Sequence, residues 1–247
     1  MTTVGHAPAL LETAFPVASS RRQFIQGVLG PGKPPLIVAS MSRSASTVLY
    51  RAIAEGWARA RFGALGPHLQ PLICDNAWRL DETPLIGGVV YKTHDLPERL
   101  PRETGAKVVF TYRRASEVAI SIFARRQLKP KFFEEHRTHL GGSGGIRAFA
   151  KRDSLGLERQ VDQWFAAEDL DMLGIRYDQL WDRLPDIEAF LGFRVPLKPF
   201  RAGKPHDLPD EVIANLRKVY HRLDRKIEAM PAMFTRSAPD RRSKVGI

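Results

Sequence analysis

Residues 36–53 (LIVASMSRSASTVLYRAI) begin as an apolar strand, end with helical spacing and carry small, hydroxylated residues between the two. The first turn of a helix presents backbone N–H groups without an intrahelical partner and a partial positive charge, so a phosphate binds well there. The hydroxyls of Ser44, Ser46 and Thr47 add donors, and the Arg43 guanidinium adds a charged, forked donor. The pattern predicts an anion-binding strand–loop–helix, with an ordinary helix N-cap as the structural alternative.

The same loop differs from the nucleoside-triphosphate loop. That loop has the form G-x-x-x-x-G-K-[ST], whereas residues 42–47 contain neither glycine nor a Gly-Lys pair. These absences argue against a nucleotide-dependent, kinase-like enzyme. We keep it as an alternative, which binding of ATP with Mg²⁺ tests.

A second strand-to-helix segment, residues 107–123 (KVVFTYRRASEVAISIF), carries another pair of anion-binding side chains. Arg113 ends the predicted strand, and Ser121 lies two turns into the predicted helix. Open α/β folds bind ligands at the carboxyl edge of the sheet, so we expect both side chains to converge on one phosphate there.

His94 is the histidine best placed for proton transfer, because it directly follows a strand-like run and has Lys92 two residues before it. An imidazole titrates near neutral pH and accepts a hydroxyl proton within hydrogen-bond distance. A lone histidine is more often structural, so the residue type alone leaves both readings open.

Strands and helices alternate along the chain, and they must position these residues. Apolar runs predict four strands, and helical spacing follows three of them. The predicted strands are 36–39, 85–91, 107–112 and 172–177, and the predicted helices are 21–29, 47–61, 116–126 and one ending at Phe190. This alternation predicts the α/β class, a single domain with a mainly parallel central sheet flanked by helices.

We expect one domain over residues 1–247, because this length suits one sizeable core and not clearly two. Residues 1–34 read as an N-terminal arm that ends in the breaker PGKPP, and residues 235–247 as a flexible basic tail. The run 141–145 (GGSGG) predicts a flexible hinge or loop.

Composition bounds the partners and the location. The chain has 38 Lys and Arg against 27 Asp and Glu, a net charge of +11, which fits an anionic ligand, a nucleic acid, an acidic membrane or simply a basic surface. The sequence has no zinc pattern, RNP motif or convincing helix-turn-helix, so we expect no nucleic-acid partner. Cys74 is the only cysteine, and no apolar run approaches the roughly 20 residues of a membrane span, so we expect a cytoplasmic protein without a span.

Three segments together resemble the sulfotransferases that use 3′-phosphoadenosine 5′-phosphosulfate (PAPS) and release its desulfated product, PAP. Residues 42–47 (SRSAST) are similar to the family's 5′-phosphosulfate loop, whose usual forms are PKSGTTW and PRSGST. Residues 91–97 (YKTHDLP) are similar to its KTHLP segment, and residues 107–123 to its 3′-phosphate segment, a strand ending in Arg and a helix with Ser eight residues on. The resemblance implies the family's P-loop-like α/β fold and PAPS as donor, without a metal.

The resemblance also implies a set of donor-binding residues. These are Arg43, Ser44, Ala45, Ser46, Thr47 and Val48 at the 5′ end, Arg113 and Ser121 at the 3′-phosphate, Tyr177 at the adenine, and Arg201, Gly203 and Lys204 in a closing loop. The chain departs from the family where Ala45 replaces the loop glycine and Ala202 replaces the closing-loop lysine. A PAPS-binding but inactive homologue is therefore the main alternative.

Sulfuryl transfer moves SO3 in line from PAPS to a hydroxyl or an amine, and it needs positioning and positive charge where negative charge develops. The resemblance implies that Arg43 neutralises the leaving phosphate, that Lys92 supports the sulfuryl group, and that His94 is the base. Asp95 as the base, and a surface salt bridge for Lys92, are the alternatives.

The sequence leaves the acceptor open among small molecules, peptides and glycans. We expect its walls to come from residues 62–84 and 124–160, with the run 141–145 in a lid. Residues 134–139 (EEHRTH) hold two histidines without an HExxH pattern, so we expect a solvated helix end or an acceptor segment rather than a metal site. The oligomeric state, a homodimer included, is also open.

Overall fold

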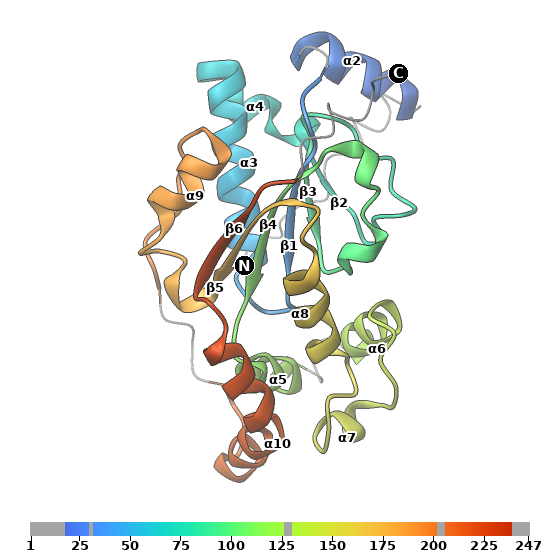
Figure 1. The fold of residues 1–247 in the computed structure, drawn as a ribbon, viewed down its shortest axis with the longest axis vertical. Helices are drawn as coiled ribbons and strands as arrows, with labels where there is room; N and C mark the ends of the chain where they lie inside the picture. The colour runs from blue at the N-terminus through green and yellow to red at the C-terminus, as the bar shows by residue number, and fades with distance from the viewer. Residues whose placement is uncertain (1–17, 30–31, 126–129, 202–205, 239–247) are drawn as a thin grey trace.

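A six-stranded sheet forms the centre of the computed structural model, which describes residues 18–29, 32–125, 130–201 and 206–238 (Figure 1). Its strand order is β2-β3-β1-β4-β5-β6. The strands are β1 (Leu36–Ser40), β2 (Cys74–Asn76), β3 (Val90–Thr93), β4 (Lys107–Tyr112), β5 (Asp171–Arg176) and β6 (Met233–Arg236). Neighbouring strands run parallel except β5 and β6, which are antiparallel. The predicted α/β class with a mainly parallel sheet is confirmed.

Helices cover both faces of this sheet. They are α2 (Ala18–Leu29), α3 (Ser46–Phe62), α4 (Gly66–Leu69), α5 (Ala115–Arg125), α6 (Pro130–His139), α7 (Ile146–Phe149), α8 (Leu157–Ala166), α9 (Leu184–Leu191) and α10 (Asp210–Ala229). Phe110 of β4 stacks on Trp164 of α8, and Phe110 lies in register with Ala39 and Thr93. Since side chains alternate along a strand, Lys92 points to the other face, where its ammonium group reaches Thr47 of α3.

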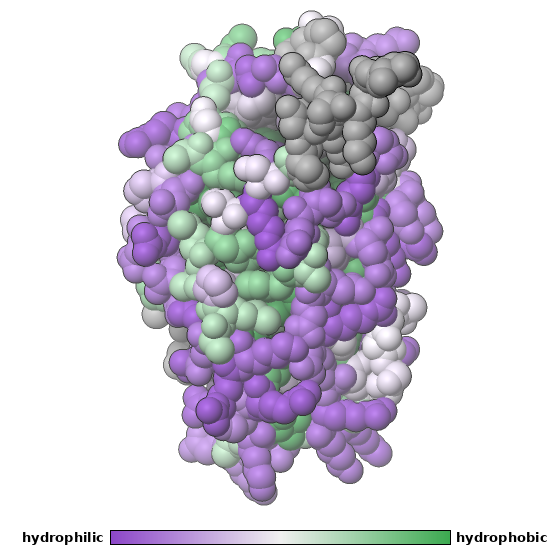
Figure 2. All heavy atoms as spheres, in the orientation of Figure 1, coloured by the Kyte–Doolittle hydropathy of each residue, from purple (hydrophilic) through white to green (hydrophobic). Residues whose placement is uncertain are grey.

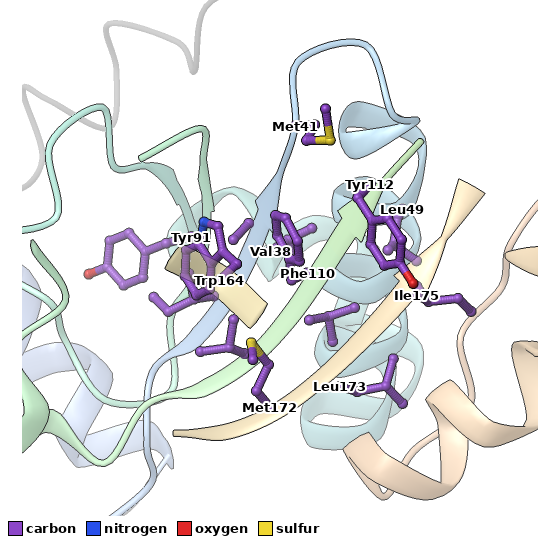
Figure 3. Close-up of a cluster of buried hydrophobic side chains, with 14 of the residues drawn as sticks. Val38, Met41, Leu49, Tyr91, Phe110, Tyr112, Trp164, Met172, Leu173 and Ile175 are labelled. Carbon is purple, nitrogen blue, oxygen red and sulfur yellow. The ribbon is translucent and has the colours of Figure 1, made fainter. Parts of the chain in front are cut away.

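The apolar core lies between these layers (Figure 3). All residues of β1 are buried, as expected for a parallel strand covered on both faces, which reads as a continuous apolar run. Val38, Phe110 and Met172 bring side chains from three neighbouring strands into this core. The result is a rigid sheet whose carboxyl edge carries the loops described below.

One strand, two short edge strands and the C-terminal tail differ from the sequence predictions. The predicted strand 85–91 is in fact β3 at Val90–Thr93, because Gly88 has a φ of 83° and forms a turn, with its N–H donating to the Pro34 carbonyl oxygen. The short edge strands β2 and β6 were not predicted. The predicted tail starts too early, because Thr235 and Arg236 still pair with β5.

The face of the molecule shown in Figure 2 is mostly hydrophilic, with apolar residues gathered where α9 and β6 lie in Figure 1. Ile25 of α2 is buried, so this part of the predicted N-terminal arm packs on the core. Within the described residues, no helix combines the length and the apolar character that a membrane crossing requires.

Candidate functional site

The loop between β1 and α3 has the shape and the unpaired groups of an anion site. Arg43 and Ala45 both have left-handed φ values, 68° and 60°, which cost a non-glycine residue roughly 1–2 kcal/mol each. Alternation of such residues turns successive N–H groups toward one side, the arrangement that forms an anion-binding nest. The Ser42 and Ser44 hydroxyls are buried and have no hydrogen-bond partner among the described residues. Strained backbone and unpaired buried donors together fit a phosphate in this loop.

Arg43 and Arg113 join this loop to the other predicted phosphate segment. The Arg43 Nε donates to the Ser121 Oγ at 2.9 Å, across 78 residues of sequence. Arg113 donates from Nη1 to the Arg43 carbonyl oxygen at 3.1 Å, and its guanidinium lies 4.5 Å from the centre of the Tyr177 ring. Four of the predicted donor-binding residues, contributed by three segments of the chain, therefore meet at the carboxyl edge of the sheet.

The charge of this cluster is predominantly positive. Burial lowers the pKa of Arg43, and the neighbouring charges of Arg125 and Arg113 lower it further. Sequence reasoning missed Arg125, although its position one helical turn after Ser121 on α5 places it on the same helix face. Glu117 opposes the cluster, because its carboxylate accepts from Arg113 Nε at 2.9 Å and pairs with the same guanidinium. A bound phosphate would compete with Glu117 for that guanidinium.

His94 lies just beyond β3 and is half-buried, with its Nδ1 3.1 Å from the Ser40 carbonyl oxygen. The Ser40 Oγ also lies 3.0 Å from Nδ1, and a hydroxyl can either donate or accept. We assign the hydrogen of the neutral ring to Nδ1, because the carbonyl oxygen only accepts, so that Nε2 carries the lone pair. Burial and the nearby charges of His136 and Lys92 lower the pKa of His94 to about 3. His94 is thus an unprotonated acceptor at neutral pH, the form that a general base needs.

Lys92 lies between His94 and the loop. Its Nζ donates to the Thr47 Oγ1 at 3.0 Å, and burial together with Arg51 and Arg43 lowers its pKa. Lys92 is not in a surface salt bridge among the described residues, since its hydrogen bond goes to the start of α3. The predicted catalytic side chains and the predicted anion loop therefore adjoin each other.

Known proteins were compared with this chain. No protein-family model and no curated protein matches it. Among solved structures it is similar to mouse sulfotransferase SULT7A1 complexed with PAP, at 17% identity and a TM-score of 0.42, over 90% of this chain and 81% of that one. Two structures of retinol dehydratase are also similar. The structure with androsterone and the inactive cofactor PAP has 19% identity and a TM-score of 0.39, over 80% of this chain and 68% of that one. The structure with retinol and PAP has 16% identity and a TM-score of 0.40, over 83% of this chain and 69% of that one.

All three of these structures hold PAP. The mouse protein is a member of the family that the sequence motifs resemble. At this level of likeness, the case for the chemistry rests on the residues of this chain.

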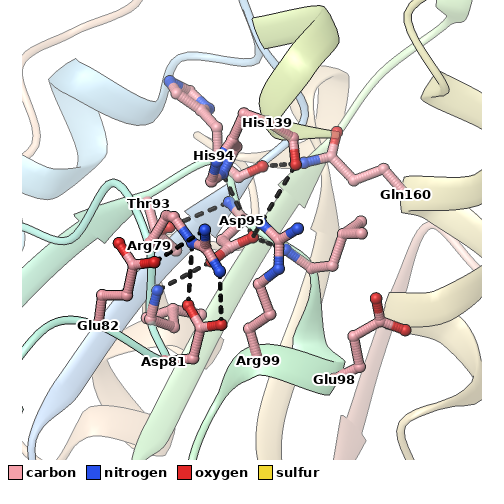
Figure 4. A network of polar contacts seen from close by, with 12 residues as sticks. Arg79, Asp81, Glu82, Thr93, His94, Asp95, Glu98, Arg99, His139 and Gln160 are labelled. Atoms are coloured by element: carbon pink, nitrogen blue, oxygen red, sulfur yellow. Dashed lines mark hydrogen bonds and ion pairs between the residues drawn. The ribbon is translucent and has the colours of Figure 1, made fainter. Parts of the chain in front are cut away.

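Asp95, the alternative base, is fully buried in a network that occupies both of its oxygens (Figure 4). The backbone N–H groups of Leu80 and Leu96 donate to it at 2.8 Å each, and Arg99 donates at 2.9 Å. The His139 Nε2 lies 3.2 Å from the same carboxylate. These partners make Asp95 a structural anchor for the turn after β3, which leaves His94 as the base candidate.

Changing Asp95 to asparagine is expected to lower the free energy of unfolding by about 2–3 kcal/mol, because charge-assisted hydrogen bonds are lost in a buried site. Urea denaturation followed by far-UV circular dichroism measures this change. The matched control is Asp162→Asn, because the Asp162 side chain is 44% exposed and pairs with Lys226. That variant is expected to change stability by less than about 1 kcal/mol. Equal effects in the two variants would contradict the anchor role of Asp95.

The segment 134–139, expected to be a solvated helix end or an acceptor segment, is solvated only in part: Glu134, Glu135 and Thr138 are exposed, and its two histidines are not. His136 and His139 are only 3% and 5% exposed, because Trp78 packs on both rings at 5.0 and 4.6 Å. The His136 ring also lies 5.1 Å from the His94 ring. In the described residues, no group of three His, Cys, Asp or Glu side chains is arranged to hold a metal ion.

Acid is expected to destabilise the fold through His136. Burial lowers its pKa to about 4 from an ordinary value of 6.5, so the unfolded chain binds a proton that the folded chain does not. The stabilising effect is complete above the unfolded pKa and is lost as the pH falls toward the folded one. Between neutral pH and a pH of about 5, the loss is about 2 kcal/mol.

Urea titrations at the two pH values measure this loss for the wild type and for His136→Phe. The variant, which has no imidazole at this position, is expected to lose about 2 kcal/mol less than the wild type. The same pH dependence in both proteins would show that His136 does not contribute to it.

A cavity of about 520 Å³ lies beside these histidines. Seven of its lining residues come from the two segments that the sequence predicted as acceptor walls: Trp78, Arg79, Lys131, Glu134, Glu135, Thr138 and His139. The eighth, Arg99, lies outside both segments. Trp78, which lines this cavity, contacts the His136 ring, and the His136 ring in turn contacts that of His94.

The run 141–145 has a packing role in addition to the flexibility predicted for it. A Cβ on Gly142 would lie 2.3 Å from the Ser154 carbonyl oxygen, and one on Gly141 would lie 2.8 Å from the Arg159 guanidinium. These glycines therefore allow the chain to close against residues 154–159 at the end of α6.

The closing-loop prediction is the least supported by the geometry. Arg201 is exposed, and in the described part of the chain no hydrogen bond or ion pair connects it to Arg113 or Ser121. Gly203 and Lys204 lie outside the described residues. Val48, the last residue predicted for the 5′ loop, is exposed on the first turn of α3.

Proposed function

We propose that this chain is a sulfotransferase that moves a sulfuryl group from PAPS to a hydroxyl or an amine. The observation that carries the proposal is the hydrogen bond from Arg43 to Ser121, because it joins the segments that resemble the 5′-phosphosulfate and 3′-phosphate sites. The unpaired Ser42 and Ser44 hydroxyls and the surplus of guanidinium groups support it, since both favour a ligand with two separate anionic ends.

In this proposal each residue has a distinct task. The N–H groups of the loop and Arg43 bind the 5′-phosphate and neutralise the charge that grows on it as the bridging S–O bond breaks. Arg113 and Ser121 bind the 3′-phosphate, Arg125 adds a second cation there, and the Tyr177 ring lies beside the adenine. This two-point attachment aligns the sulfur with the incoming nucleophile.

The acceptor reaches the sulfur from the His94 side. His94 Nε2 takes the proton of the nucleophile while the new bond to sulfur forms, and Lys92 stabilises the negative charge on the sulfuryl oxygens during the transfer. We propose that the acceptor enters through the cavity beside Trp78. The same proposal includes a single sulfotransferase domain, a small-molecule acceptor and, from the single cysteine, a reducing cytoplasmic location.

Release of PAP from PAPS in the presence of a panel of hydroxyl and amine acceptors tests the function. We expect PAP release to require an acceptor and to continue unchanged when Mg²⁺ is removed with a chelator. PAP binding without turnover of any acceptor would favour the inactive homologue. Turnover of ATP with Mg²⁺ and none of PAPS would favour the kinase-like alternative.

A further inference from the structure

His136 has an unused hydrogen-bond acceptor next to the transfer site. Its Nδ1 lies 2.9 Å from the Phe132 carbonyl oxygen one turn earlier on α6, which fixes the hydrogen of the neutral ring on Nδ1. Its Nε2 therefore carries a lone pair, and this atom is buried without a partner among the described residues. Buried polar atoms are nearly always paired, so this one indicates a ligand group with a hydrogen to donate.

The neighbour of His136 on the transfer side is His94, whose ring lies 5.1 Å away. His94 has the same tautomer, because the Ser40 carbonyl oxygen takes the hydrogen of its Nδ1. Two neutral imidazoles that each offer a lone pair cannot hydrogen-bond to each other. A nucleophile placed between the two rings therefore meets two imidazole acceptors.

Burial, and then nearby positive charge, keep both rings neutral by lowering their pKa values. Lys92 and Arg43 are close enough to His136 to lower its pKa, and Lys92 also lowers that of His94. Neighbouring His139, held beside Asp95, acts on both rings in the same direction. The matching nucleophile is consequently uncharged, because a cation would be repelled by Lys92 and Arg43.

Counting hydrogens distinguishes the two acceptor chemistries. A hydroxyl has one hydrogen, so it satisfies one imidazole and leaves the other unpaired. A neutral primary amine has two hydrogens, one for each ring, and a lone pair that remains free to attack sulfur. Alkylamines are protonated at neutral pH, as the ordinary lysine pKa near 10.4 shows, whereas an amine attached to an aromatic ring is not.

We propose that the acceptor is an arylamine, whose –NH2 group donates one hydrogen to His94 and the other to His136. The inference rests on the proposed function. The N–S bond forms as the bridging S–O bond of PAPS breaks, the electron pair leaves with PAP, and one amine proton passes to His94 Nε2. The second N–H stays on the nitrogen of the sulfamate product and keeps its hydrogen bond to His136.

The walls of the approach suit a flat ring. Trp78 lines the cavity, packs edge-on against His136 and is 43% exposed, so it covers the His136 ring from the cavity side. Phe132 lies 4.1 Å from the same imidazole. An arylamine that enters from the cavity displaces the Trp78 cover and places its ring among these aromatic side chains.

The test compares aniline with phenol as acceptors and measures kcat/KM for each with PAPS, in the wild type and in His136→Phe. The expected result is a preference for aniline in the wild type, and a fall of the aniline-to-phenol ratio by roughly tenfold or more in the variant. His136→Gln keeps an acceptor oxygen and is expected to retain most of the preference. His136→Met serves as the acceptor-free variant if phenylalanine prevents folding.

PAP affinity, measured on the same samples, distinguishes a failure of the arylamine inference from a failure of the proposed function. Three results would overturn the arylamine inference: a preference for phenol, an unchanged aniline-to-phenol ratio in His136→Phe, or no transfer to aniline. If PAP still binds in those cases, the donor site stands. Absence of PAP binding in the wild type would instead overturn the proposed function itself.

Discussion

Replacing His94 with alanine is expected to lower the turnover number with PAPS by about a hundred- to ten-thousandfold, the range that general bases contribute. The variant is expected to bind PAP as the wild type does, because the residues around the loop, Arg43, Arg113 and Ser121, are unchanged. The reason is the tautomer assigned to His94, in which Nδ1 contacts Ser40 and Nε2 carries the lone pair that takes the proton.

Single-turnover kinetics with saturating PAPS measures the His94 effect without interference from PAP release. His68→Ala is the matched control, since His68 is an exposed histidine on α4. We expect its rate to equal that of the wild type. A rate for His94→Ala close to the wild-type rate would move the base to another residue, and His136 would be the next to examine.

Replacing Arg113 with alanine is expected to weaken PAP binding by roughly 10- to 150-fold, because a charged hydrogen-bonding group contributes about 1.5–3 kcal/mol. Arg113 lies against the Arg43 carbonyl oxygen and over the Tyr177 ring, so its loss removes a phosphate contact and loosens the loop. Arg113→Lys is expected to recover only part of the affinity, since an ammonium group lacks the planar fork.

Titration calorimetry with PAP measures the Arg113 effect, and two neighbours supply its controls. Arg114→Ala removes the same charge one residue later, from a side chain that is 56% exposed and paired with Glu228, and it is expected to leave affinity almost unchanged. Glu117→Gln is expected to strengthen PAP binding, because it removes the anion that competes for Arg113. Equal losses in Arg113→Ala and Arg114→Ala would mean that only net charge matters.

The sequence predicted those parts of the site that depend on short segments. The strand–loop–helix at residues 36–53 and the strand–helix at residues 107–123 have local patterns strong enough to place Arg43 and Arg113 just after strands and Ser121 two turns into a helix. In a parallel sheet, all such ends meet at one edge, so their convergence follows from the fold class.

Properties set by distant contacts could not be predicted in this way. The segment 134–139 reads as polar, yet His136 is buried because Trp78, from a loop more than fifty residues earlier, packs on it. Asp95 is an anchor only because Leu80 and Arg99 donate to it. No local signal distinguishes a buried, satisfied carboxylate from an exposed one.

Backbone conformation in the loop after β1 was also not predicted from the sequence. The loop contains no glycine, and the residue types alone do not indicate the left-handed values at Arg43 and Ala45. For Ala45, the one signal was that it replaces the loop glycine of the family that the motif resembles. Conversely, Gly87 and Gly88 lie inside the predicted strand 85–91 and delay its start to Val90, a signal that the sequence did contain. Arg125 was also visible, as a basic residue one helical turn after Ser121.

The central claim is that this chain binds a nucleotide carrying phosphates at both its 3′ and 5′ positions, and titration calorimetry with PAP tests it most directly. The comparison titrations use AMP, which lacks the 3′-phosphate, and ATP with Mg²⁺. We predict micromolar binding of PAP, binding of AMP weaker by tenfold or more, and no heat from ATP, the tenfold being roughly the effect of one charged contact. No binding of PAP, or equal binding of PAP and AMP, would contradict the account.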